Sequence, residues 1–398
     1  MTRRIFITVA EVSGDKHAAQ LIRELRELDP HIMIEGLGGP EMEEAGAVIH
    51  RNTVLKAAMG WRGLLRAIEV YKLLKWTGAY FDANRPDLWI GVDSPSMNFH
   101  FARLAHDRGV PTLQYVAPQL WAWALWRMKK LRRWVDQVAC ILPFEEKFFG
   151  DHGVHASFVG HPLFDELPPR LVKPPGERFP NRPPVIGLLA GSRKSEAQAN
   201  FPGMLSCARQ IRHAFPAAVF LAPTTPATHP IVTGLLADDR CAAALDVEVG
   251  LNRFDEMVPR CDLCLTVSGT ATLHVASFNV PMIVVYRVSK TAWNLAGRWL
   301  VPTRTIALVN VLAKDARTGD VRSRDGHIVP EFMPWSDAGE AGDLALEMLE
   351  NPEKLAAQRE KLHGLIASLD QPGASRKVAA MALEMIRRSG SRSPGIVP

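Results

Sequence analysis

The chain has 398 residues, 47 Lys and Arg against 42 Asp and Glu, a formal net charge of +5 and a hydrophobic content of 47%. This length suggests two to three domains with cores of their own, and the balanced charge with abundant apolar residues excludes a disordered chain. A surplus of five charges is too small to predict nucleic-acid binding, and five cysteines do not make a disulfide framework.

The first residues resemble the front of a secretion signal, but the apolar run that starts at Ile5 stops at Glu11 and Ser-Gly-Asp follows. This favours a buried first strand over a signal peptide. No stretch approaches the roughly 18 uninterrupted apolar residues of a membrane-spanning helix. We therefore expect a cytoplasmic protein that is still able to touch a bilayer.

Residues 1–167 alternate short apolar runs with helical patterns. Strands are predicted near 5–10, 87–93, 112–116, 135–142 and 157–159, and helices near 16–28, 97–108 and 122–134. This alternation is typical of βαβ units and a mainly parallel sheet. The range 1–167 is therefore predicted to be one Rossmann-like domain.

Seven prolines then lie within 168–184, and a segment so poor in backbone N–H donors is predicted to be a linker. The alternation resumes over 185–370, which predicts a second Rossmann-like domain. A C-terminal helix over 371–388 could pack back on the first domain, and 389–398 is expected to be a frayed tail. The predicted class is α/β, with two doubly wound domains facing a cleft and ligands at the carboxyl ends of strands.

Two carboxylates lie at predicted strand ends in the first half. Glu11 follows the first strand, where Gly14 permits a tight turn and Ser13 or Asp15 could cap the next helix. Asp93 ends a run of apolar residues, where it could accept a proton from an incoming hydroxyl or form an Asx turn. A turn and a cap do not account for Glu11, so a functional role stays open for it, and the residues alone leave both interpretations open for Asp93.

Aromatic and cationic residues follow the third predicted strand. Trp121 and Trp123 stand beside its end. Trp126 follows, and a cation-rich segment then extends from Arg127 to Arg133. Such a segment could bind single-stranded nucleic acid, or a sugar and an anionic phosphate. A solvated basic helix is the more frequent outcome, and without a known motif we expect no nucleic-acid partner.

Two loops of the second half place glycine between a predicted strand and a helix. Each would present free N–H groups of a helix N-terminus to a diphosphate, and the arginine in the first loop adds a guanidinium group. Two ordinary capped helices are the alternative. The loops consist of Gly191, Ser192, Arg193, Ser268, Gly269 and Thr270.

The remaining candidate clusters predict no metal site. Cys261 and Cys264 form a single C-x-x-C with apolar flanks and are interpreted as packing residues. His152, His155 and His161 match no metal template. We expect neither a metal nor another cofactor.

An amphipathic pattern over 57–76 alternates apolar residues with Arg62, Arg66, Lys72 and Lys75. A helix of this kind could lie on a bilayer with its cations toward anionic lipid. A helix that covers the sheet is the more frequent outcome.

Taken in order, these junctions resemble the lipid-A-disaccharide synthase family, inverting glycosyltransferases of lipid A assembly. The matching segments are AEVSGDKHAAQLIREL (10–25), MGW (59–61), GVDSPSMNFH (91–100), YVAPQLWAW (115–123), ILPFEEKFF (141–149), FVGHPL (158–163), LLAGSRKSE (188–196), SGTATLHVASFNVPMIVVYR (268–287) and ALVNVLA (307–313). The YVAPQLWAW and ILPFEEKFF segments are the specific ones, whereas GSR and SGT occur in many two-domain glycosyltransferases.

The resemblance implies a GT-B type glycosyltransferase whose 185–370 domain holds UDP and whose 1–167 domain faces the acceptor and the membrane. The implied reaction joins UDP-2,3-diacylglucosamine to 2,3-diacylglucosamine 1-phosphate, with inversion and release of UDP. The implied location is the cytoplasmic side of the inner membrane, with peripheral attachment. The sequence does not fix the oligomeric state, and a homodimer is one possible assembly.

The resemblance also assigns roles to residues. It implies that Asp93 is the general base, that Glu11 is a further acidic residue of the site and that Arg193 binds phosphate. The other implied nucleotide-sugar contacts are Gly191, Ser192, Ser268, Gly269, Thr270, His274 and Asn310. The implied acceptor or sugar contacts are Ser13, Trp121, Trp123 and Arg127.

The sequence departs from the family pattern at several places. Ser96 stands in place of an acid, His274 in place of a glutamate that contacts ribose, and Ala10 and Ala124 in place of glycine and arginine. The departures at Ser96 and His274 leave open a non-catalytic paralogue that binds nucleotide sugar or lipid. A second rival is a UDP-sugar epimerase or hydrolase of the same architecture.

Overall fold

The computed structural model describes residues 3–54, 63–122, 124–166, 182–238, 243–287, 305, 307–313, 326–335 and 338–391. Its contacts divide the chain into two compact units. Unit 1 comprises residues 1–167 and 370–398, and unit 2 comprises residues 168–369. Most of the predicted linker and the start of the predicted amphipathic helix lie outside the described residues.

Unit 1 is built on a seven-stranded parallel sheet in the order β3-β2-β1-β4-β5-β6-β7. Its two central strands are buried on both faces apart from the first residue of β1. The strands are β1 (Arg4–Thr8), β2 (Met33–Gly38), β3 (Val48–Asn52), β4 (Leu88–Val92), β5 (Thr112–Tyr115), β6 (Gln137–Cys140) and β7 (Ala156–Phe158). The chain order reverses between β1 and β4, so the sheet has its topological switch point there.

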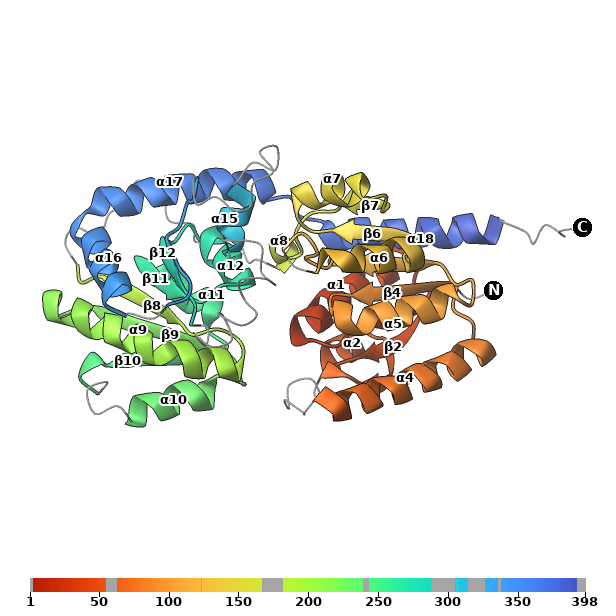
Figure 1. Cartoon of the computed structure of the whole chain (residues 1–398), viewed down its shortest axis with the longest axis horizontal. Coiled ribbons are helices and arrows are strands. Elements are labelled where there is room, and N and C mark those ends of the chain that lie inside the picture. Colours follow the sequence, from red (N-terminus) through yellow and green to blue (C-terminus); the bar gives the residue numbers. More distant parts are fainter. Residues whose placement is uncertain are drawn as a thin grey trace, which may run out of the picture. The chain divides into compact units, whose positions relative to one another are not determined.

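Helices of unit 1 form two contacting groups, one around α1 and one around α5 (Figure 1). The helices are α1 (Val12–Leu28), α2 (Pro40–Glu44), α4 (Gly63–Ala83), α5 (Pro95–His106), η1 (Leu125–Arg127), α6 (Met128–Trp134), α7 (Pro143–Asp151), α8 (Leu163–Glu166) and α18 (Ala374–Ser391). Phe81 of α4 and Phe101 of α5 are both buried with Trp89 of β4 in one core cluster.

The C-terminal helix α18 belongs to unit 1 and packs on α1 (Figure 1). The carboxylate of Asp165 accepts hydrogen bonds from the backbone N–H groups of Gly373 (2.7 Å), Ala374 (3.1 Å) and Ser375 (2.9 Å). An anionic acceptor at a helix N-terminus satisfies donors that the helix itself cannot pair. This contact fixes the start of α18 to α8.

Unit 2 is built on a six-stranded parallel sheet in the order β10-β9-β8-β11-β12-β13. The strands are β8 (Val185–Leu189), β9 (Val219–Thr224), β10 (Val247–Leu251), β11 (Leu263–Thr266), β12 (Met282–Val285) and β13 (Glu331–Phe332). The helices are α9 (Lys194–Ala214), α10 (His229–Asp238), η2 (Ala243–Leu245), α11 (Phe254–Met257), η3 (Val258–Arg260), α12 (Thr270–Ser277), α15 (Leu308–Ala313), α16 (Ala338–Glu350) and α17 (Pro352–Leu369). The chain order reverses between β8 and β11.

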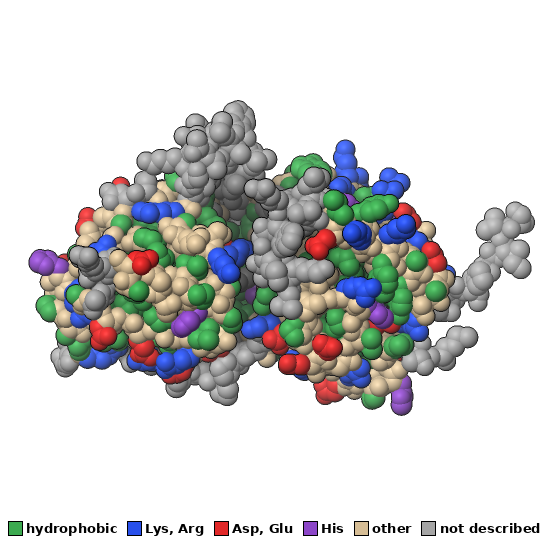
Figure 2. All heavy atoms as spheres, turned by 90° about the horizontal axis from the view of Figure 1, so that it is seen from below, with side chains coloured by type: hydrophobic (Ala, Val, Ile, Leu, Met, Phe, Trp, Pro, Cys, Tyr) green, Lys and Arg blue, Asp and Glu red, His purple; other side chains and the backbone are tan. Residues whose placement is uncertain are grey.

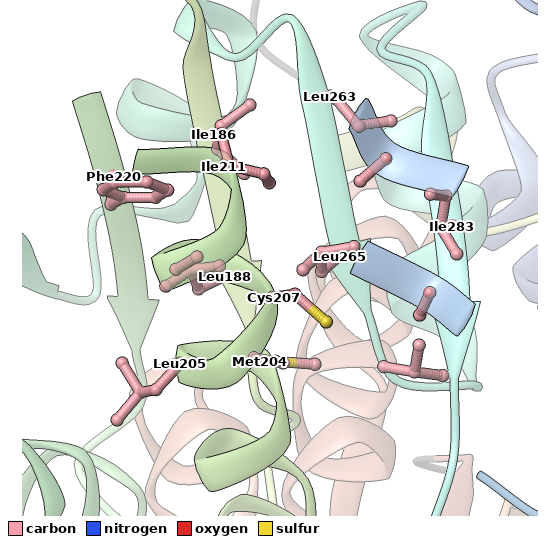
Figure 3. Packing of buried hydrophobic residues seen from close by; sticks show 14 of the residues in the cluster. Ile186, Leu188, Met204, Leu205, Cys207, Ile211, Phe220, Leu263, Leu265 and Ile283 are labelled. Atoms are coloured by element: carbon pink, nitrogen blue, oxygen red, sulfur yellow. The ribbon is translucent and has the colours of Figure 1, made fainter. Parts of the chain in front are cut away.

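The core of unit 2 lies between α9 and the central strands. Figure 3 shows Met204 and Cys207 of α9 beside Leu188 of β8 and Leu265 of β11. The prediction that Cys261 and Cys264 are packing residues is confirmed. Both are fully buried, and a Cβ added at Gly187 would lie 2.6 Å from Cys264 Sγ.

Acidic and basic side chains are interspersed over the face of the molecule in Figure 2, in keeping with the small net charge. In the part of the chain that the structure describes, no helix combines the length and apolarity needed to cross a membrane. The predicted α/β class with two parallel, doubly wound sheets is confirmed.

Candidate active site

Residues predicted to be functional flank the switch points of both sheets. In unit 1, Glu11 follows β1 and Asp93 follows β4, and these two strands are paired in parallel. In unit 2, the loop that begins at Gly191 follows β8 and the loop that begins at Ser268 follows β11, which is paired with β8. Ligands of open α/β sheets bind outside the carboxyl ends of the strands at such reversals.

Asp93 is half-buried and has an unusual backbone. Its φ is 51° and that of Ser94 is 48°, so two successive residues with side chains occupy the left-handed region. Each such residue costs on the order of 1–3 kcal/mol and persists only where the surroundings hold it. The backbone N–H of Asp93 donates to the carbonyl of Tyr115 (3.0 Å), and the Ser13 hydroxyl donates to Asp93 Oδ2 (3.4 Å).

A buried carboxamide of α5 holds this backbone. Asn98 Nδ2 donates to the carbonyls of Val92 (3.1 Å) and Asp93 (2.7 Å), while its Oδ1 accepts from the Thr8 hydroxyl (2.8 Å). Asn98 is 1% exposed. The bonds tie the end of β4 to β1, so Asn98 fixes the segment from which the Asp93 carboxylate projects.

A second carboxamide supports the same carbonyl from β5. Gln114 is buried, and its Nε2 donates to the carbonyls of Asp93 and Tyr115, both at 3.2 Å. Sequence reasoning missed both Asn98, which lies in the matching segment 91–100, and Gln114, which directly precedes the matching segment 115–123. Their signal was a carboxamide between two apolar or aromatic neighbours, Met97 and Phe99 for Asn98 and Leu113 and Tyr115 for Gln114.

The first turn of α1 lies against Asp93. A Cβ added at Gly14 would lie 3.0 Å from Val9 Cγ1 and 3.4 Å from Asp93 Cβ, so glycine allows the helix to approach the end of β4 closely. Glu11 is the half-buried N-cap residue of α1, but its carboxylate does not cap the helix. The structure thus brings Ser13 and Gly14 to Asp93 and places Glu11 at the neighbouring strand end.

The prediction that Ser13 or Asp15 caps α1 is wrong, because α1 already begins at Val12. The buried carboxylate of Asp15 instead accepts from the backbone N–H groups of Gly39 (2.9 Å) and Glu41 (3.1 Å) at the start of α2. Burial raises the pKa of Asp15, and these N–H donors lower it. Asp15 therefore joins the first turn of α1 to the start of α2.

Trp121 connects two segments of the family resemblance. Its Nε1 donates to Glu145 Oε1 (3.0 Å), and its ring packs edge-on against Phe144 at a centroid distance of 5.2 Å. Burial raises the pKa of Glu145 to about 7, although the hydrogen bond from Trp121 favours the charged form.

Arg127 is half-buried, with its guanidinium over the Trp126 ring. Trp123 lies outside the described residues.

The loop after β8 requires glycine and places an arginine at a helix start. Gly191 has a φ of 100°, and an added Cβ would lie 2.7 Å from Glu196 Oε2 and 2.9 Å from Val267 Cγ2. Arg193 is the N-cap residue of α9, and its exposed guanidinium donates to Glu196 Oε1 (2.9 Å). An exposed pair of this kind contributes about 0–1 kcal/mol, so an anionic ligand can compete for Arg193.

The loop after β11 lies beside the loop after β8. The N–H of Val267 donates to the carbonyl of Leu189 (3.2 Å), which joins the two strand ends. Gly269, with a φ of 137°, is the N-cap residue of α12, and an added Cβ there would have no atom of the described residues within 4 Å. Ser268 is half-buried, whereas Ser192 is exposed. The two loops together present two helix N-termini at one sheet edge.

His274 and Asn310 are engaged inside unit 2. His274 lies 2.8 Å from an oxygen of Asp255, and its ring stacks on Phe278 and lies at a tilt to Phe254. Asn310 is fully buried.

The carboxamide of Asn310 donates to the carbonyl of Val329 (2.8 Å) and to Glu331 Oε1 (2.5 Å) and accepts from Ile328 (2.8 Å) and Val329 (3.0 Å). These bonds give Asn310 a structural role between α15 and β13 that the sequence did not predict.

Sequence reasoning also missed Tyr286, a polar residue whose electrostatic neighbours include Arg193 and Glu196 at the start of α9. It follows β12 and is half-buried, and burial together with the charge of Glu196 raises its pKa. Within the described residues, no group of three His, Cys, Asp or Glu side chains is arranged to hold a metal ion.

Comparison with known proteins gives concordant results. A family model described as lipid-A-disaccharide synthetase matches residues 5–383. The lipid-A-disaccharide synthase of Geobacter sulfurreducens is 34% identical over 398 residues, which cover 97% of this chain and 98% of that protein. The protein of the same name from Anaeromyxobacter sp. (strain K) is 35% identical over 395 residues, with 97% and 98% covered.

Solved structures agree on the fold. MurG of Acinetobacter baumannii superposes with a TM-score of 0.56 at 13% identity and covers 96% of this chain and 99% of its own. The UDP-GlcNAc 2-epimerase of Neisseria meningitidis, bound to UDP-GlcNAc, gives 0.62 at 12% identity, with 96% and 100% covered. At these identities the likeness concerns the fold alone, and it confirms the predicted GT-B type architecture.

We predict that Asn98→Ala lowers the free energy of unfolding by about 1–3 kcal/mol, because the carbonyls of Val92 and Asp93 lose a buried donor. Urea unfolding followed by circular dichroism measures the change. Gln137→Ala serves as the matched control, because it removes a half-buried carboxamide of β6 whose Nε2 donates to the Ser157 hydroxyl (3.1 Å). Equal effects of the two substitutions would contradict the role given to Asn98.

The raised pKa of Glu145 predicts a pH dependence of stability. The folded protein binds this proton more tightly than the unfolded chain, so its contribution is full below the usual value of 4.5 and is lost as the pH rises through about 7. Glu145→Gln mimics the protonated side chain, so its melting temperature should fall less than that of the wild type over this range. Glu146→Gln, on the exposed face of α7, should follow the wild type. Parallel curves for all three proteins would contradict the prediction.

Proposed function

Because this chain belongs to the lipid-A-disaccharide synthase family, we propose that it joins UDP-2,3-diacylglucosamine to 2,3-diacylglucosamine 1-phosphate and releases UDP. The match covers nearly the whole chain, so both units take part in the family likeness. The observation that carries the proposal is the placement of Asp93 at one switch point and of two helix N-termini with Arg193 at the other.

In the proposed reaction, the Asp93 carboxylate removes the proton from the acceptor hydroxyl. The oxygen then attacks the anomeric carbon of the donor, the bond from that carbon to the UDP oxygen breaks, and UDP leaves with the bonding electrons. Attack from the side opposite to UDP inverts the configuration. The support for this role of Asp93 is its left-handed backbone, whose carbonyl accepts hydrogen bonds from Asn98 and Gln114. Strained backbone of this kind is found mostly at functional sites.

We assign the diphosphate of the donor to the two loops of unit 2. Gly191, Ser192, Ser268, Gly269 and Thr270 would offer backbone N–H groups at two helix starts. Arg193 would supply a guanidinium that exchanges Glu196 for phosphate as negative charge develops on UDP. His274 is assigned to the nucleotide end of the site, and Asn310 is assigned to holding α15 in place.

We assign the acceptor to unit 1. Ser13 is within hydrogen-bond distance of Asp93, while Glu11, Trp121, Trp123 and Arg127 follow strands of the same sheet. Both substrates carry acyl chains, so we propose that the enzyme works in the cytoplasm at the surface of the inner membrane. Ile68 and Tyr71, two large side chains of α4 that are 44% and 67% exposed, support a contact with lipid.

The rival functions receive less support. Epimerases share the fold at 12% identity, which carries no argument about chemistry, whereas the synthases match along the full length at about a third identity. A protein that only binds nucleotide sugar needs no proton acceptor, so it would not require a carboxylate at the end of β4 on a strained backbone.

We predict that Asp93→Asn lowers the rate of disaccharide formation by about 10²–10⁴-fold, because the amide cannot take the proton from the acceptor. The purified protein is incubated with both acylated substrates, and the product is measured by mass spectrometry. Asp82→Asn, which removes an exposed carboxylate that pairs with Arg108 in the same unit, is the control and should retain the wild-type rate. A wild-type rate for Asp93→Asn would contradict the mechanism.

We predict that Arg193→Ala weakens UDP binding by about ten-fold or more, because a charge-assisted hydrogen bond to phosphate is lost. Isothermal titration calorimetry gives the Kd directly. Arg260→Ala, at an arginine that lies beside Glu248 elsewhere in unit 2, should leave the Kd unchanged. Unchanged UDP affinity in Arg193→Ala would show that the loop after β8 does not hold the diphosphate.

A further inference from the structure

Two large apolar side chains project into solvent side by side in unit 1. Leu125 is 51% exposed and Trp126 is 64% exposed, and both belong to η1. They follow β5, which is the parallel neighbour of β4, so the segment leaves the sheet at the same edge as Asp93. None of the roles assigned above uses these two side chains.

Cations surround this apolar pair. Arg127 and Lys130 lie 5.2 and 5.5 Å from the centroid of the Trp126 ring. Helix α6 buries Met128 and Leu131 and exposes Lys129, Arg132 and Arg133. The sequence holds no Asp or Glu from residue 108 to residue 135, so no acidic side chain of this segment offsets these charges.

The helix packed against α6 adds one arginine, whose charge is shared with a carboxylate. Helix α5 contacts α6, and there Arg103 lies over the Trp134 ring at 5.6 Å and pairs with Asp107 at 3.4 Å. Burial lowers the pKa of His100 on α5, and the charges of Lys130 and Arg103 lower it further. The excess of positive charge therefore lies on α6, next to the apolar tip formed by Leu125 and Trp126.

We propose that Leu125 and Trp126 insert into a bilayer that carries anionic phospholipids, while the α6 cations bind the lipid phosphates. Tryptophan and leucine suit the boundary between acyl chains and headgroups, and each nearby Lys or Arg adds affinity for an anionic surface. A nucleic-acid strand would need successive aromatic platforms for its bases, whereas this tip offers one aromatic and one aliphatic side chain.

This inference deepens the membrane association proposed above, because it names the segment that enters the bilayer and its lipid class. It also sets an orientation for unit 1, with the carboxyl edge of the β4 and β5 strands toward the membrane. Vesicle binding is measured without substrate, so this inference can fail while disaccharide formation succeeds, and the reverse.

The first test uses the full chain with sedimented vesicles of phosphatidylglycerol and phosphatidylcholine, or of phosphatidylcholine alone. We expect binding to the anionic vesicles and a partition coefficient lower by about ten-fold in Leu125→Ala/Trp126→Ala. Leu251→Ala, at an exposed leucine of unit 2, is the matched control and should bind like the wild type. Equal binding of the double variant and the wild type would overturn the proposal.

The charge requirement is tested with Lys129→Gln/Arg132→Gln, which should lose on the order of twenty-fold in partitioning to anionic vesicles. Lys361→Gln/Lys377→Gln removes the same charge from exposed positions on α17 and α18 and should behave like the wild type. Equal losses in the two variants would mean that net charge, and not this surface, governs binding, and would overturn the proposal.

Insertion is tested with brominated acyl chains, which quench tryptophan fluorescence on contact. The wild type should be quenched, and Trp126→Phe should bind equally well but lose most of the quenching. Quenching that is unchanged in Trp126→Phe would overturn the placement of Trp126 in the bilayer. Binding of a single-stranded RNA oligonucleotide that depends on Trp126, with no vesicle binding, would identify a nucleic-acid surface and also overturn it.

Discussion

Neighbouring strands of a parallel sheet end at the same edge, and this constraint positions the proposed active site in both units. The pairing of β1 with β4 places the loop after β1 beside Asp93, and the pairing of β8 with β11 places two helix starts together. The residues of these loops then need only short-range adjustments to come into contact. Gly14 and Gly191 permit the close approaches that this convergence requires.

The proposed base sits on a backbone that would relax without support. Two left-handed residues in succession are held by carboxamides from the following helix and the neighbouring strand. Each carboxamide is buried and bonds carbonyls that would otherwise have to find water. Rigidity at Asp93 therefore comes from polar groups inside the core, and an apolar residue at Asn98 or Gln114 would pack there without holding the carboxylate in position.

The sequence predicted the central strands because their buried residues form continuous apolar runs, and it predicted Asp93 and Arg193 because each ends such a run or follows it. In unit 1 it missed β2 and β3; β3 is an edge strand whose last three residues are polar. It also assigned Asp15 to the wrong helix. The second error has a physical cause. A capping side chain can serve a helix 24 residues away, and local pattern carries no sign of that partner.

The return of α18 to unit 1 has a consequence for synthesis on the ribosome. Residues 370–398 complete a unit whose other residues emerge before position 168, with the whole of unit 2 between them. Until the last helix has left the ribosome, the face of α1 that packs on α18 stays uncovered, and the Asp165 carboxylate lacks the three N–H groups that it binds. Unit 2 can therefore fold first, and a nascent chain that stops at Leu369 leaves its N-terminal unit unfinished.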